Sequence, residues 1–185
     1  MHTARERPAA IDARRVELVL ACLVAGGTFL LGPRLLVVPS LLVPTVADVL
    51  AGLGARRALV VHGAGGVDEL TPAGPNLVYE VEGGEVRPGE IDPEDLGIPR
   101  CDPEDLSGGS PEENAAAIRA IFSGETGPRR DAVLLNAAAA LIVAGMVEDL
   151  SEGLTLAEAT VHSGTAADRL DALIQFSRHE GAKAS

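Results

Sequence analysis

Two adjacent carboxylates, Asp68 and Glu69, are the side chains whose type and placement point most directly to chemistry. They end a glycine-rich turn at residues 63–67, which follows an apolar run at residues 58–62. Such a run is typical of a strand buried on both faces, and glycines at its end let the backbone pass close to a ligand. Carboxylate oxygens are ligands that Mg²⁺ takes when substrate phosphates supply others. The pattern predicts a site that binds metal and phosphate, with a solvated polar turn as the alternative.

The other candidate side chains predict structure rather than chemistry. His62 ends the apolar run, where histidines are more often hydrogen-bonded structural residues than general bases. Asn114 and Asn136 fall inside predicted helices, where an amide can satisfy the backbone groups of neighbouring loops. No metal-ligand spacing joins the remaining histidines, His2, His162 and His179. The sequence predicts no catalytic residue, and its substrate-binding residues are not identified.

Three elements must position the acidic loop. A short strand at residues 34–38, a helix at residues 43–53 and the strand at residues 58–62 follow one another along the chain. Strand, helix and strand in this order form a βαβ unit, which crosses over right-handedly within one sheet. The expected fold class is therefore α/β, with a partial mixed, mostly parallel sheet flanked by helices and a helical C-terminal part.

The segment after the acidic loop predicts a small hairpin and two short helical turns. Gly-Gly at residues 83–84 lies between two stretches that we expect to be strands, residues 77–81 and 85–87, as in a two-residue hairpin turn. The word Pro-Glu-Asp-Leu then occurs twice, at residues 93–96 and 103–106. Two copies are too few for a solenoid, so short helical turns in a surface loop explain them better.

The remainder of the chain predicts helices. Ser110 and Glu113 have the spacing of a capping box, for a helix that ends near Gly124. The next helix, residues 128–144, is apolar on nearly every side and should run through the interior. A last amphipathic helix begins near Thr165.

The chain divides into three parts. Residues 1–34 form a divergent N-terminal segment, residues 35–178 an α/β domain, and residues 179–185 a tail that we expect to fray. At 185 residues with 46% hydrophobic residues, the chain is long enough and apolar enough to build one core. Aromatic residues make up only 2% of it, so Ala, Val and Leu must fill that core.

Charge and targeting signals narrow the classes of partner. The formal net charge of −12 repels phosphodiester backbones, which argues against nucleic acid as a partner. The apolar run at residues 18–31 is shorter than the ~20 residues that span a bilayer. Glu17 and the lack of a small-x-small cleavage site argue against a signal peptide, so we expect no membrane partner. Cys22 and Cys101 match no disulfide or metal spacing and predict reduced thiols in the cytoplasm.

From about Leu35 onward, the chain carries several short sequence motifs that resemble those in the C-terminal half of the anthranilate phosphoribosyltransferase family. That family is part of the type 3 glycosyltransferase and nucleoside phosphorylase group. The matching motifs, in family order, are residues 57–63, 67–70, 93–97, 106–109, 113–115, 130–138, 152–153 and 157–164.

The resemblance implies a reaction and a metal site. In this family, the amine of anthranilate displaces pyrophosphate from phosphoribosyl pyrophosphate (PRPP), giving N-(5-phosphoribosyl)anthranilate for tryptophan biosynthesis. The family's adjacent acidic pair corresponds to Asp68 and Glu69 here, and it holds the Mg²⁺ that accompanies the pyrophosphate. A metal ion neutralises charge that collects on such a leaving group. The resemblance therefore implies PRPP and anthranilate as substrates and Mg²⁺ as the cofactor.

Two family motifs are missing from these 185 residues. The Gly-Thr-Gly-Gly-Asp loop and the Lys-His-Gly-Asn segment, which bind PRPP in the family, do not occur, and the position of the family's anthranilate-contacting arginine is Gly27. We therefore expect about half an enzyme, inactive by itself. The alternatives are an inactive remnant, one subunit paired with an N-terminal half chain, a homodimer, or a nucleoside phosphorylase relative.

Overall fold

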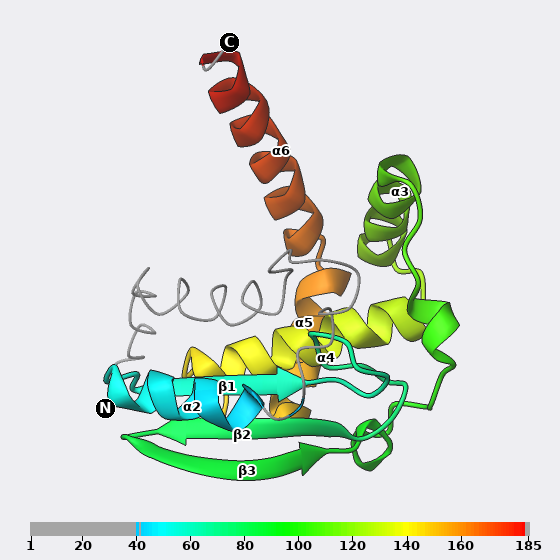
Figure 1. Ribbon diagram of the computed structural model, residues 1–185. Helices are drawn as coiled ribbons and strands as arrows, with labels where there is room; N and C mark the ends of the chain where they lie inside the picture. Colours follow the sequence, from blue (N-terminus) through cyan, green and yellow to red (C-terminus); the bar gives the residue numbers. More distant parts are fainter. Residues whose placement is uncertain (1–39, 41, 184–185) are drawn as a thin grey trace, which may run out of the picture.

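A computed structural model describes residue 40 and residues 42–183, so the divergent segment 1–34, the expected strand 34–38 and Cys22 lie outside the described residues. In the described chain, the strands follow the first helix, α2, and all lie in the first half (Figure 1). The elements are α2 Leu42–Gly52, β1 Arg57–His62, β2 Asn76–Glu82, β3 Glu85–Ile91, η1 Pro93–Leu96, η2 Pro103–Leu106, α3 Pro111–Phe122, α4 Pro128–Val143, α5 Leu150–His162 and α6 Thr165–Lys183.

The three described strands form an antiparallel sheet in the order β1-β2-β3. The expected α/β class is confirmed, but the expected mostly parallel pairing is not found among the described strands. The reason lies in the connections, because a parallel neighbour needs a crossover and neither connection within this sheet contains a helix. The β2–β3 hairpin is as predicted, with positive φ angles at Gly83 (58°) and Gly84 (89°) in its turn.

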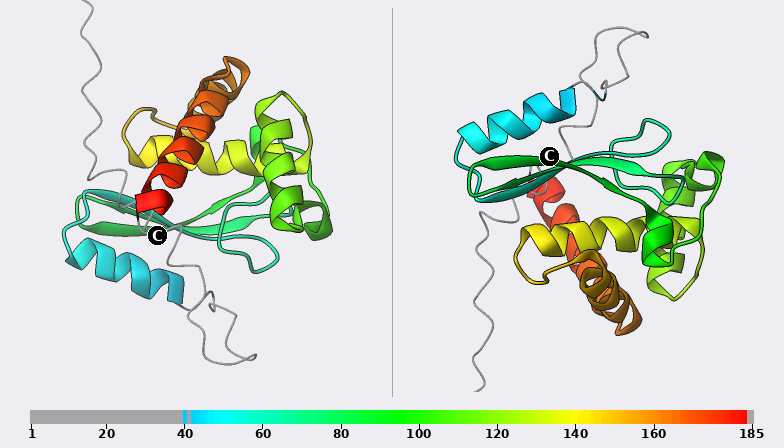
Figure 2. Two further views of the ribbon diagram at one scale, coloured as in Figure 1. Left: turned by 90° about the horizontal axis from the view of Figure 1, so that it is seen from above. Right: turned by 90° about the horizontal axis from the view of Figure 1, so that it is seen from below.

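The sheet is covered on both faces, by α2 on one side and α4 on the other (Figure 2). Alternate residues of β1 point to opposite faces, as the two-residue period of a strand requires. Ala58 and Val60 pack with α2, whereas Leu59 and Val61 pack in the cluster that includes Leu135 of α4. This arrangement confirms the prediction of a strand buried on both faces, and it places the end of β1 between two helices.

The second half of the chain is helical, as predicted. Ser110 and Glu113 form the expected capping box at the start of α3, and both Pro-Glu-Asp-Leu words form 3₁₀ turns. The α3 and α6 helices project from the body of the molecule (Figure 1), and Arg119 of α3 is 3.2 Å from Asp171 of α6. The last helix continues to Lys183. No helix of the described chain has the length and apolar character needed to cross a membrane.

The α4 and α5 helices pack at a glycine. A Cβ at Gly153 of α5 would lie 2.9 Å from both Cα and Cβ of Ala138 in α4, closer than real Cβ contacts. We predict that Gly153→Ala lowers the free energy of unfolding by about 1–3 kcal/mol, because neither helix backbone can move aside freely. Urea unfolding followed by circular dichroism measures this change.

The control is Gly52→Ala at the end of α2, where an added Cβ meets nothing within 4 Å. That substitution should be neutral or stabilise the protein by up to about 1 kcal/mol, since alanine favours helix. Equal effects of the two substitutions would show that the α4–α5 contact does not depend on Gly153.

Candidate functional site

The acidic loop follows β1 and is shaped by its glycines. The Gly63 N–H donates to the carbonyl of Val67, and the Gly66 N–H donates to the carbonyl of Gly63, each at 3.0 Å. Gly65 and Gly66 have φ angles of 85° and 84°, in the left-handed region that favours glycine. A Cβ at Gly63 would overlap the carbonyl oxygen of Glu69. The predicted role of these glycines in turn geometry is confirmed.

A buried amide, Asn76, holds the chain that returns from this loop to the sheet. Its Oδ1 accepts hydrogen bonds from the backbone N–H of Thr71 (2.9 Å) and of Ala64 (3.4 Å). Its Nδ2 donates to the carbonyls of Thr71 (3.0 Å), Gly74 (3.0 Å) and Ile91 (3.1 Å). Sequence reasoning missed this residue. The available signal was a polar residue directly before the apolar stretch of β2.

A second amide reaches the loop from α4. Asn136 accepts from the backbone N–H of Leu70 at 3.0 Å and donates to the carbonyl of Leu70 at 2.7 Å. Asn114 of α3 contacts Gly109 in the same way, at 2.8 Å and 3.1 Å. The prediction that both helical asparagines satisfy backbone groups of neighbouring loops is therefore confirmed, although Asn114 lies at an exposed position.

Asp68 and Glu69 lie side by side on the exposed part of the loop, and neither forms an ion pair within the described residues. Desolvation raises the pKa of the Glu69 carboxyl, and the neighbouring charge of Asp68 raises this pKa further. No cluster of three or more His, Cys, Asp or Glu side chains that could hold a metal ion occurs in the described part of the chain. The acidic pair fits a divalent cation only if phosphate or water supplies the other ligands.

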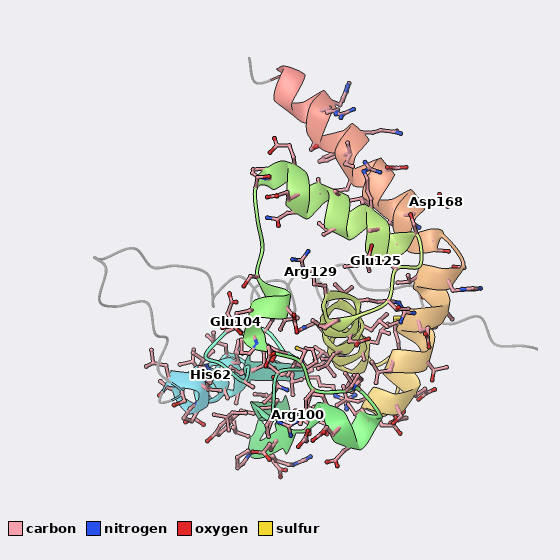
Figure 3. All side chains as sticks on the ribbon, turned by 90° about the vertical axis from the view of Figure 1, so that its right-hand side faces the viewer. His62, Arg100, Glu104, Glu125, Arg129 and Asp168 are labelled. Atoms are coloured by element: carbon pink, nitrogen blue, oxygen red, sulfur yellow. The ribbon has the colours of Figure 1, made fainter. Side chains whose placement is uncertain are left out.

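Arg100 and Arg129, both labelled in Figure 3, already have structural partners. Arg129, at the start of α4, donates to the carbonyls of Asp105 (3.2 Å) and Ser107 (2.8 Å). Arg100 pairs with Asp92 at 2.7 Å and with Glu94 at 3.0 Å. His62 ends β1 and is half-buried. The chemistry that this region can offer is therefore concentrated in the two carboxylates.

The described chain is an α/β protein with an acidic loop that follows a buried strand. A comparison with known families identifies the family that has this domain. Residues 34–167 match the family described as "Glycosyl transferase family, a/b domain", and the chain belongs to this family.

The similar proteins are anthranilate phosphoribosyltransferases. The chain is 53% identical to that of Desulforudis audaxviator over 131 residues, which are 71% of this chain and 38% of that enzyme. It is 52% identical to that of Parvibaculum lavamentivorans over 128 residues, again 38% of that enzyme and 69% of this chain. The chain thus spans 38% of the length of each of these relatives.

Solved structures share the fold. The anthranilate phosphoribosyltransferase from Thermus thermophilus matches with a TM-score of 0.66 and 42% identity, over 76% of this chain and 41% of that chain. The enzyme from Saccharomyces cerevisiae, solved in complex with PRPP and Mg, matches with a TM-score of 0.65 and 24% identity, over 72% of this chain and 39% of that chain. At that identity, the yeast structure shows the shared fold alone.

The raised pKa of Glu69 predicts a pH dependence of stability. The folded state binds this proton more tightly than the unfolded chain, so folding loses stability as the pH rises from the ordinary glutamate range through the raised pKa. Glu69→Gln removes this loss, and the variant should be more stable than the wild type at pH 7 but not near pH 4. Urea unfolding at a series of pH values tests this.

Glu148→Gln, an exposed glutamate between α4 and α5, shows the effect of removing one charge elsewhere. An identical pH response in both variants would mean that the environment of Glu69 has no special influence.

Proposed function

We propose that this chain supplies the binding site for metal and pyrophosphate in an anthranilate phosphoribosyltransferase, and that this enzyme acts in the cytoplasm. The observation that carries the proposal is the pair Asp68 and Glu69, which has no ion-pair partner among the described residues and sits on a loop fixed to both α4 and β2. The two bacterial relatives, each at least 52% identical, support the choice of reaction.

The reaction itself explains why such a site is needed. The anthranilate nitrogen forms a bond to the ribose C1, the bond from C1 to the pyrophosphate oxygen breaks, and the amine loses a proton. Negative charge collects on the departing pyrophosphate. Asp68 and Glu69 would hold Mg²⁺, which, when bound, supplies the positive charge that neutralises this leaving group. The remaining ligands would be phosphate oxygens and water.

We propose further that a polypeptide segment carrying the PRPP-binding motifs completes the site. This rests on the 38% share of the relatives' length that the chain spans. A stripe of apolar side chains on α2 also supports it. Leu42, Val46 and Val49 are 47%, 37% and 54% exposed, although each is a large hydrophobic residue. Exposed apolar surface of this kind is typical of an interaction site.

The first functional prediction concerns the 185-residue chain by itself. We expect no phosphoribosyl transfer when it is mixed with PRPP, anthranilate and Mg²⁺, because transition-state stabilisation is shared among groups that act as a unit. The measurement is the loss of anthranilate fluorescence. Turnover above a control without protein would overturn the need for a second segment.

The second functional prediction concerns a reconstituted enzyme. A segment of the Thermus thermophilus enzyme that carries the PRPP-binding motifs would be supplied as a separate chain. If activity appears, Asp68→Asn and Glu69→Gln should each lower kcat by about 100-fold or more, as expected for the loss of several kcal/mol at the leaving group. Their effect on stability should stay within about 0.5 kcal/mol, apart from the gain expected for Glu69→Gln.

Glu148→Gln serves again as the matched control, since it removes one exposed carboxylate away from the loop. The rates are to be compared across a range of Mg²⁺ concentrations. Unchanged rates and an unchanged Mg²⁺ dependence in both loop variants would show that Asp68 and Glu69 form only a polar turn. Sizing of the chain with and without the second segment distinguishes a mixed complex from a homodimer.

A further inference from the structure

The side chain of Asn136 in α4 is hydrogen-bonded to the end of the acidic loop. This asparagine lies in the middle of α4, directly after Leu135, which is fully buried in the core beneath the sheet. Its partner residue, Leu70, follows Glu69 and is itself fully buried. The peptide group that joins Glu69 to Leu70 is therefore held from a rigid element of the core.

The hydrogen bonds of the Asn136 amide are already in use. Its Nδ2 donates to the carbonyl of Leu70 at 2.7 Å and to the carbonyl of Ala132, one turn earlier in α4, at 2.9 Å. Its Oδ1 accepts from the backbone N–H of Leu70 at 3.0 Å. Since an asparagine side chain has two N–H hydrogens, no donor remains for a substrate. Asn136 can therefore affect a bound pyrophosphate, which accepts hydrogen bonds, only through the loop.

We infer that Asn136 is a positioning residue, which holds Asp68 and Glu69 in the arrangement that receives a divalent cation with its pyrophosphate. The inference rests on the proposed function. Two adjacent carboxylates repel each other, and a loop free to relax would separate them. Fixing Leu70 at both its N–H and its carbonyl restrains the backbone next to Glu69.

The test uses this chain mixed with the second segment proposed above, with Mn²⁺ as a spectroscopic substitute for Mg²⁺ and inorganic pyrophosphate as the phosphate ligand. Electron paramagnetic resonance measures the Mn²⁺ bound in the presence of pyrophosphate. Asn136→Ala should weaken this binding by about 10- to 100-fold, the range found when groups that orient metal ligands are removed. Asn136→Gln keeps the amide but displaces it by one methylene group, and it should recover part of the lost affinity.

Two controls separate positioning from a loss of folding. Asn114→Ala removes the same pair of hydrogen bonds, to Gly109, and should leave Mn²⁺ binding unchanged. Val81→Ala weakens the core on the α2 side of the sheet, and it should lower the unfolding midpoint without changing the affinity. All affinities are to be measured well below the unfolding midpoint of each variant.

The outcomes distinguish this inference from the proposed function. If the wild type binds Mn²⁺ and pyrophosphate no better than the double variant Asp68→Asn, Glu69→Gln, the proposed metal site itself is wrong and the inference is overturned with it. If the double variant loses binding but Asn136→Ala does not, only the positioning role is overturned. The same holds if Val81→Ala loses as much affinity as Asn136→Ala.

Discussion

The acidic loop depends on one buried side chain, the amide of Asn76. Residues 63–75 connect β1 to β2 without a helix or strand of their own, so many of their backbone groups lack a regular partner. A buried N–H or carbonyl left without a hydrogen bond costs about 1–3 kcal/mol. Asn76 is fully buried, and its side chain forms hydrogen bonds with two backbone N–H groups and three backbone carbonyls. These groups lie at both ends of the connection and at the end of β3. The loop can therefore be long and still have a defined shape.

Small residues allow the helices to hold this loop closely. With so few aromatic side chains, the core is built mainly from alanine, valine and leucine, which lets backbones approach one another. The contact of Gly153 with Ala138 brings α5 against α4, and Leu135 and Ala139 bring α4 against the sheet. Because α4 is fixed on both sides, its Asn136 has a fixed position relative to β1. Close packing remote from the loop thus contributes to the placement of the carboxylates.

Local signals in the sequence predicted most of the elements. The capping box at Ser110, the glycines of the β2–β3 turn and the apolar character of α4 each depend on residues close together in the chain. The direction of strand pairing depends on which strands become neighbours, and the helix at residues 42–52 suggested a parallel crossover that the described sheet does not contain. The strand that would have been its partner lies outside the described residues.

The acidic pair could be picked out from the sequence, but the side chains that hold its loop could not. Asp68 and Glu69 stand out in sequence because two acids follow a glycine-rich turn, whereas Asn76 contacts residues on three separate segments and gives no spacing signal of its own. The roles of Asn114 and Asn136 were predicted in kind, since polar groups inside helices need partners, but the identities of those partners were not.

Charge repulsion within the acidic pair lowers the stability of the folded protein. Two neighbouring carboxylates with no ion-pair partner in the described chain repel each other, and desolvation, together with this repulsion, raises the pKa of Glu69. A flexible loop would relieve the repulsion, but it would have to be ordered again each time a cation bound. The amides of Asn76 and Asn136 instead order the backbone during folding. The electrostatic destabilisation is then present in the free protein, and the proposed divalent cation would relieve it with little reorganisation of the loop.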